Sequence, residues 1–248
     1  MAYGIFIFVL FIISYHLNLK NTSSVNTVIG AHFLMEERFT IDFVINELLL
    51  VLIGITIAII FNMFHLNKGH KKGLIEKIQY TEKKLQDILE ELALFLMEDT
   101  WTRDVWVDID VIKKEIKQFR LEAYYYRENT FDSRTGYYME YFEMRLKQCE
   151  ILDNLHSEML KIRSVPIQAK VVADYILYLK GFVDEDNNPE MQLVRLYELL
   201  ERMREEPLPI SREEFETRAI LYHMLMDLEE FVIYKSKYYE AISYIASK

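Results

Sequence analysis

A tyrosine-rich stretch near the middle of the chain contains the residues best suited to bind a small molecule. Its polar and aromatic side chains recur at steps of three and four residues, which places them on one face of a helix. They are Tyr138, Tyr141, Arg145 and Gln148. An arginine on such an apolar face needs an anion, because an unpaired buried charge costs several kcal/mol. That anion is either a carboxylate of a neighbouring helix or the carboxylate of an aromatic ligand stacked on the tyrosines.

Four polar residues in or between the apolar stretches nearer the N-terminus could act within a membrane. They are His32, Asn46, Glu47 and Asn62. Ionisable groups at membrane depth are costly and usually face protein or a water-filled cavity. Glu47 is therefore a candidate functional carboxylate, with His32 as its proton partner. The alternative is that Glu47 lies at the level of the lipid head groups and is simply hydrated, because it is about one helical turn from the edge of its apolar stretch.

These polar groups would be positioned by apolar segments within residues 1–72, which we interpret as a membrane domain. Residues 3–17 and 43–64 are predicted spans, and residues 25–35 are predicted to form a short re-entrant or interfacial helix. The second span has about 22 residues, and a rise of 1.5 Å per residue gives roughly 33 Å, enough to cross a bilayer. Lysines at positions 68–72 follow it and favour a cytoplasmic location for the rest of the chain.

Residues 73–248 are predicted to form a cytoplasmic up-and-down helical bundle, so the predicted fold class is all-α. Apolar residues recur there at steps of three and four, and the whole chain has only seven glycines and four prolines. The first, second, third and last helices should form the central four, with the fourth and fifth as a hairpin on the side or end. The expected helices cover about 72–97, 107–129, 136–163, 164–183, 189–205 and 211–247.

Local signals mark several helix boundaries. Ser164 is expected to cap the fourth helix, and Ser211 with Glu214 forms a capping box that opens the last one. Gly69 and Gly73 predict a break between the second span and the first helix of the bundle.

Charge and motif content exclude several functions. The net charge is −10, and residues 1–72 contain only five of the 29 basic and four of the 39 acidic residues. The acidic bundle is repelled by nucleic acid, so no nucleic-acid partner is expected. The single cysteine, Cys149, allows no intrachain disulfide. Phosphate loop, nucleophile elbow and Cys/His metal cluster are all missing from the sequence, so we expect no enzyme, catalytic residue, metal or cofactor.

Several segments resemble the aromatic acid exporter family of Gram-positive bacteria over essentially the whole chain. They are residues 137–148 (YYMEYFEMRLKQ), residues 208–219 (LPISREEFETRA), Val25-Asn26-Thr27 with His32, and Asn46-Glu47 leading to Gly54, Ala58 and Asn62. The resemblance implies a multi-pass protein of the cell membrane with a cytoplasmic helical domain, and a role in exporting aromatic carboxylates. It also implies further spans ahead of residue 1, because members of the family have several.

Two functions remain open from the sequence. The first is a component of a transporter that exports small aromatic acids, with a bundle that binds substrate or regulates transport. The second is a membrane-anchored interaction or sensor module without transport activity of its own. In both, the expected partners are membrane lipids, a small aromatic acid, and either further transmembrane helices or a second copy. The small residues Gly54 and Ala58, four apart on one helix face, would admit such a neighbouring helix.

Overall fold

The computed structural model is helical in each of its regular elements and describes most of the 248 residues. The described residues are 2–16, 27–28, 30–31, 40–65, 67–98, 105–130, 135–162, 166–184 and 187–246. Packing divides the chain into two compact units, Met1–Phe64 and His65–Lys248. The predicted all-α fold class is confirmed.

The first unit contains helices α1 (Ala2–His16) and α3 (Ile41–His65). Thr40 caps α3, because its Oγ1 accepts a hydrogen bond from the backbone N–H of Phe43 at 3.3 Å. Large aliphatic side chains are exposed on consecutive turns of α3, at Ile45, Leu48, Leu49, Leu52, Ile53, Ile55, Ile57, Ile59 and Ile60. The sequence of α3 is apolar around its whole circumference because these positions do not form one stripe.

The two segments predicted as membrane spans, 3–17 and 43–64, correspond to α1 and α3. Among the residues that the structure describes, none of the helices meets the length and apolarity required of a membrane span. The predicted short helix over 25–35 lies mostly outside the described residues, of which 27–28 and 30–31 are helical. Membrane insertion of these segments stays a prediction.

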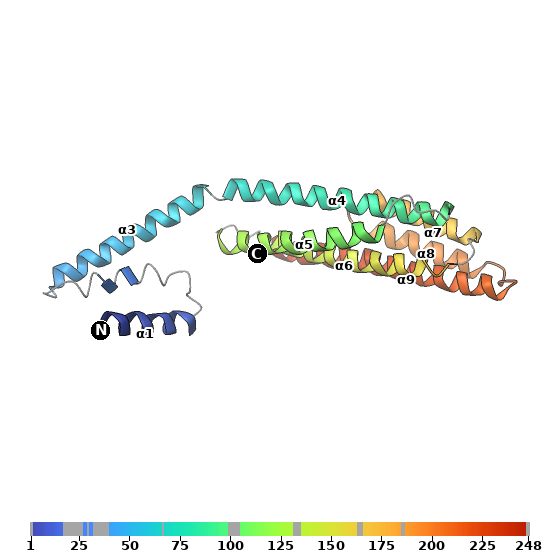
Figure 1. The fold of residues 1–248 in the computed structure, drawn as a ribbon. Coiled ribbons are helices and arrows are strands. Elements are labelled where there is room, and N and C mark those ends of the chain that lie inside the picture. Colours follow the sequence, from blue (N-terminus) through green and yellow to red (C-terminus); the bar gives the residue numbers. More distant parts are fainter. Residues whose placement is uncertain are drawn as a thin grey trace. The chain divides into compact units, whose positions relative to one another are not determined.

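The second unit contains the long helices of the bundle (Figure 1). They are α4 (Asn67–Glu98), α5 (Val105–Glu128), α6 (Gly136–Met159), α7 (Ile167–Lys180), α8 (Glu190–Arg204) and α9 (Arg212–Ala246). All six helices predicted for this region are present. The sequence predicts a break near Gly69 and Gly73; α3 ends at His65 and α4 begins at Asn67, so the division lies ahead of both glycines, and α4 runs through them. The boundary predicted after residue 72 therefore falls inside α4.

Neighbouring long helices run in opposite directions. Arg120 of α5 pairs with Glu143 of α6, and Lys113, further back along α5, pairs at 3.0 Å with Asp153, further along α6. Side-chain contacts show that α4 and α5, and likewise α6 and α9, are also antiparallel. The up-and-down arrangement expected from short connections is therefore present.

The core of the second unit forms where the predicted apolar seams meet. On α4 the buried side chains include Ile78, Thr81, Leu85, Ile88, Leu92 and Phe95. On α5 and α6 they include Ile112, Ile116, Ala123, Tyr126, Tyr138, Tyr141, Leu152 and Leu155. These positions recur at three- and four-residue steps, so each helix presents one apolar face to the others.

The two shorter helices differ from the prediction that they form a hairpin at the side. The two helices touch through individual side chains, as where the hydroxyl of Tyr175 on α7 donates to the backbone oxygen of Gln192 on α8 at 2.9 Å, but they do not pack along each other as a hairpin, and α8 packs more closely against α9. However, α7 packs along α4 as extensively as α6 packs along α9. Its buried face consists of small and branched residues that allow close approach: Ala169, Val172, Ala173, Ile176 and Leu179. Thus α7 is a full member of the bundle, and only α8 lies at its side.

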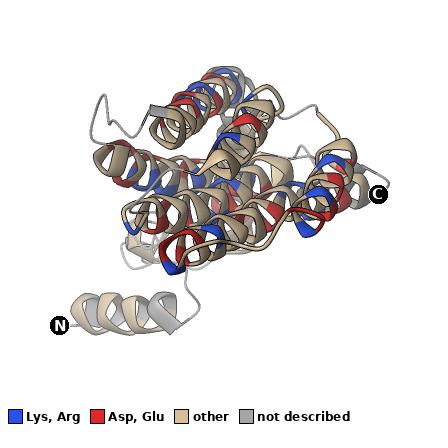
Figure 2. Ribbon diagram, turned by 90° about the vertical axis from the view of Figure 1, so that its right-hand side faces the viewer, with Lys and Arg blue, Asp and Glu red and all other residues tan. Residues whose placement is uncertain are grey.

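Charged residues cover the outer faces of the bundle helices. Figure 2 shows Lys and Arg interleaved with Asp and Glu around these helices, whereas the described part of α1 carries neither. Many of the charges form pairs within one helix or between neighbours, as between Lys180 and Glu90 at 2.9 Å. Such exposed pairs contribute less than about 1 kcal/mol each.

Candidate functional site

Arg145 is the centre of a buried polar network in the second unit. Its side chain is fully buried, with 0% exposure, in the middle of α6. Its Nη1 donates to Gln148 Oε1 at 2.8 Å, and its Nη2 lies 3.4 Å from Glu82 Oε1 on α4. Nη2 also donates to the backbone oxygen of Val183, which follows α7. One guanidinium therefore joins three segments of the bundle.

Gln148 extends this network to a fourth segment, helix α9. Its Nε2 donates to the backbone oxygen of Phe231 on α9 at 2.9 Å, while its Oε1 accepts from Arg145. The side chain is fully buried and uses both ends of its amide. A buried amide with both groups satisfied favours one register of the two helices it joins, because a shift of α9 along α6 would break the bond to Phe231 and leave the amide nitrogen unsatisfied.

Tyr141 covers one face of the guanidinium. The Arg145 Cζ lies 4.8 Å from the centre of the Tyr141 ring, and the Tyr141 hydroxyl donates to Glu82 Oε1 at 3.4 Å. Tyr238 of α9 packs edge-on against Tyr141, with ring centroids 6.0 Å apart. Tyr138 lies one turn away and packs against Tyr126, 5.9 Å between centroids. The aromatic rings thus form the walls around Arg145.

Electrostatics keep Arg145 charged in this setting. Burial on its own would lower the pKa of Arg145, but the interactions with Tyr141 and Glu82 outweigh it and raise the pKa. The Glu82 side chain retains only 13% exposure, so its carboxylate is a largely buried counter-ion. The arginine of the sequence-predicted cluster therefore has an internal anion from a neighbouring helix, one of the two alternatives left open by the sequence.

Binding of an aromatic carboxylate by Tyr138, Tyr141, Arg145 and Gln148 stays a prediction. The structure brings all four together in one buried cluster, as their spacing requires. A ligand carboxylate would have to displace Glu82 from Nη2. Glu82 and Val183 were missed by sequence reasoning. The signal for Glu82 is weak, because it is one of many carboxylates on α4 and lies beside the apolar seam rather than on it.

The polar residues predicted to act in a membrane are only partly described. Glu47 is buried, with 7% exposure, and Asn46 is exposed on α3. Asn62 belongs to α3, but its side chain lies outside the described part, and His32 lies outside it entirely. The proposed proton partnership of Glu47 and His32 stays a prediction.

A groove between α8 and Tyr178 of α7 also has suitable chemistry. It has a volume of about 950 Å³ and is lined by Tyr178, Met191, Val194, Arg195, Tyr197 and Arg202, among others. Arg195 Cζ lies 4.1 Å from the centre of the Tyr178 ring. Within the described residues, Arg195 forms no ion pair, and the side chains of Glu198 and Glu201 line the same groove. Sequence reasoning missed this groove, because it depends on how α7 and α8 face each other.

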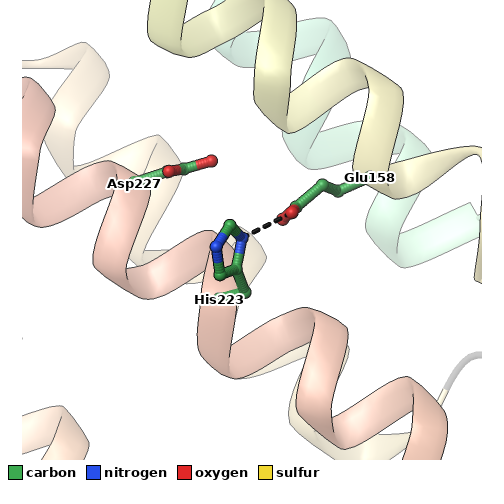
Figure 3. A group of neighbouring side chains, drawn as sticks. All are labelled: Glu158, His223 and Asp227. Atoms are coloured by element: carbon green, nitrogen blue, oxygen red, sulfur yellow. Dashed lines mark ion pairs between the residues drawn. The ribbon is translucent and has the colours of Figure 1, made fainter.

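One group of side chains could hold a metal ion, although the sequence gave no reason to expect one. Glu158 near the end of α6 lies beside His223 and Asp227 of α9 (Figure 3). The spacing of His223 and Asp227 by four residues was the available signal, because it places both on one helix face. Glu158 could be found only from the packing of α6 against α9.

Comparison with known proteins gives matches over most of the chain. Residues 71–236 match the family model described as "Putative aromatic acid exporter C-terminal domain". Residues 1–65 match the one described as "Aromatic acid exporter family member 1".

Individual relatives agree with these matches. The "Uncharacterized protein YqjA" of Bacillus subtilis (strain 168) is 30% identical over 223 residues, which are 88% of this chain and 66% of that protein. The chain thus spans slightly less than two-thirds of its relative. The crystal structure of a "putative membrane protein from Clostridium difficile 630" aligns with a TM-score of 0.61 and 25% identity, covering 68% of this chain and 98% of that one.

Proposed function

This chain belongs to the aromatic acid exporter family, and we propose that it takes part in the efflux of small aromatic carboxylates across the cell membrane. Membership of this family implies a membrane location and a transport role rather than an enzymatic one. The observation that carries the proposal is that family models match both units, over residues 1–65 and 71–236.

The first unit supplies the membrane part in this proposal. The aliphatic side chains exposed around α3 suit a lipid environment better than water, because exposing apolar surface to water costs about 25 cal/mol of free energy per Å². A Cβ added at Gly54 would meet nothing within 4 Å, which leaves room for another helix. That helix would come from further spans or from a second copy. The exposed Lys71 and Lys72 support a cytoplasmic location for the second unit.

The second unit supplies substrate recognition, and the α7–α8 groove is the more accessible place for it. An aromatic carboxylate offers a ring for Tyr178 and the exposed Met191 and Val194, and an anion for Arg195. The cluster around Arg145 has the same chemistry, but its guanidinium already holds Glu82, Gln148 and a backbone oxygen. A ligand therefore displaces fewer existing bonds in the groove.

Binding of 4-hydroxybenzoate to the full chain in detergent tests which location is used. If the groove binds it, Arg195→Ala removes the calorimetric heat, whereas Arg212→Ala leaves it unchanged. Arg212 is the control, because it pairs with Glu216 at the surface and neither residue lines the groove. Loss of binding in Arg145→Met, with full binding in Arg195→Ala, would assign the ligand to the buried cluster instead.

Efflux of labelled 4-hydroxybenzoate from membrane vesicles tests the transport role itself. We expect efflux in vesicles containing the chain, and slower efflux in Glu47→Gln. Equal rates in wild type and Glu47→Gln would remove Glu47 from the transport path without affecting the family assignment.

The second candidate function is a membrane-anchored sensor or interaction module. The observation that favours it is the apolar exposure of the groove, where Met191, Val194 and Tyr197 are 65%, 49% and 47% exposed. Ligand binding in the groove combined with no efflux from vesicles would support this function over transport.

A further inference from the structure

Three potential metal ligands meet at the interface of α6 and α9. Glu158 lies in the last turn of α6, and His223 and Asp227 lie one turn apart on α9. One ligand atom from each residue lies within 4.8 Å of the others. Figure 3 shows the Glu158 carboxylate and the His223 ring pointing toward each other from the two helices, with Asp227 one turn further along α9. Three ligands around one point are enough to hold a metal ion that keeps an open position.

The carboxylates of this group are incompletely satisfied. Glu158 Oε1 pairs with His223 Nδ1, but Glu158 Oε2 is buried and has no hydrogen-bond partner within the described part of the chain. The same holds for Asp227 Oδ2. Buried polar oxygens normally have partners, because an unsatisfied one keeps its full desolvation cost. Two such oxygens lie beside one imidazole, and no group of the described chain provides the hydrogen bonds that they lack.

The charge balance of the group also favours a cation. Two carboxylates, those of Glu158 and Asp227, meet here with a single imidazole, and one oxygen of each is buried. Repulsion between desolvated carboxylates is the situation that a bound divalent cation relieves, since the cation is then the largest local charge.

The donor set selects the kind of ion. One imidazole nitrogen and two carboxylates suit zinc, manganese and similar transition metals, whereas calcium and magnesium prefer all-oxygen sites. The side chain of His223 is 64% exposed and that of Glu158 is 15% exposed, so the ion can reach the group from solvent on the His223 side. Water can occupy the remaining coordination positions on that same side.

We propose that Glu158, His223 and Asp227 form a binding site for a divalent transition-metal cation that cross-links α6 to α9. The ion takes the place of the direct contact between Glu158 and His223. It binds across the same pair of helices that Gln148 joins further along, and so it stabilises the folded bundle by an amount that, above the dissociation constant, grows with the logarithm of its concentration. This activity lies outside the proposed export function and does not depend on it.

Metal binding to the full chain tests the site directly. The chain, solubilised in detergent and stripped with chelator, is dialysed against Zn²⁺ or Mn²⁺, and bound metal is measured by mass spectrometry. We expect one ion per chain, with affinity reduced at least about tenfold in His223→Ala and in Asp227→Asn, because even the groups that support metal ligands contribute 10–100-fold. Magnesium should not compete at equal concentration.

The control is Asp153→Asn, which removes a carboxylate from the same helix α6 but from the Lys113 pair rather than from the group. It should bind metal like the wild type. Because the His223 side chain is mostly exposed, His223→Ala should keep the wild-type circular dichroism spectrum and thus separates loss of a ligand from loss of folding. Failure to bind either ion would overturn the proposal. So would equal affinity in wild type and His223→Ala, or an equal loss in Asp153→Asn.

Discussion

Breaking the ion pair between Glu82 and Arg145 should destabilise the bundle more than breaking any of the surface ion pairs. In Glu82→Gln the shape of the side chain is kept and its charge is removed, so the fully buried Arg145 loses its counter-ion. Two unit charges at the observed 3.4 Å attract by about 5 kcal/mol at an effective dielectric constant of about 20. Because Glu82 keeps 13% exposure, solvent screens part of this attraction, and we expect a loss of about 3 kcal/mol.

Equilibrium urea unfolding of the full chain in mild detergent, followed by far-ultraviolet circular dichroism, measures this loss. The matched control is Glu90→Gln on the same helix, whose partner Lys180 lies at the surface. Its cost should stay below about 1 kcal/mol. The double variant Glu82→Gln with Arg145→Met should be more stable than the sum of the single effects predicts, by about 2 kcal/mol, because it leaves no unpaired charge. Equal costs for Glu82→Gln and Glu90→Gln, or strict additivity in the double variant, would refute the reasoning.

Three further predictions concern a helix cap, a carboxylate and the single thiol. Ser211→Ala should lower the free energy of unfolding by about 1 kcal/mol, because Ser211 Oγ accepts from the Glu214 N–H at 3.1 Å, whereas Ser243→Ala in the last turn of α9 should have little effect in the same urea titration. The pKa of Glu214 is lowered, chiefly by the Ile210 N–H, so its stabilisation is complete above the unfolded-state pKa and is lost as pH falls through the folded-state pKa. The difference in stability between wild type and Glu214→Gln should therefore vanish in acid, and a constant difference would contradict this. Burial raises the pKa of Cys149 to about 12, so iodoacetamide at pH 8 should label it only after unfolding, and labelling of the native chain would contradict its burial.

Helix positions follow from the sequence because their signals are local. The capping box predicted at Ser211 and Glu214 is confirmed by the Ser211 bond, and Glu214 reaches back to the Ile210 N–H at 2.9 Å. Apolar spacing gives the buried faces of α4, α5 and α6 for the same reason, since periodicity of three and four residues is a property of one helix. The predicted cap at Ser164 lies outside the described residues.

Errors arose where the outcome depends on competition between neighbouring segments. Gly69 and Gly73 each weaken a helix by about 1 kcal/mol, but the residues around them favour α4 strongly enough to continue through both. Similarly, the place of α7 beside α4 depends on how well its small residues fit the surface of α4. That fit cannot be predicted from the sequence of α7 alone. The partner of a buried group, such as Glu82 for Arg145, is likewise determined by how the helices pack together.

The interface of α6 and α9 contains buried polar groups at two levels, and they differ in whether the chain supplies a counter-charge. At Arg145 and Gln148, α4 supplies a carboxylate and the backbone oxygens of Val183 and Phe231 accept hydrogen bonds, so the positive charge is balanced from within, while Arg145 Nε has no hydrogen-bond partner in the described chain. Around Glu158, two carboxylates meet with a single imidazole, and one oxygen of each carboxylate is left without a hydrogen-bond partner in the described chain. Spacing alone pointed to the first level, because arginine among tyrosines suggests an anionic ligand. The balance of charge and hydrogen bonds points instead to the group around Glu158. There a cation from solution supplies the positive charge that the protein's own side chains do not.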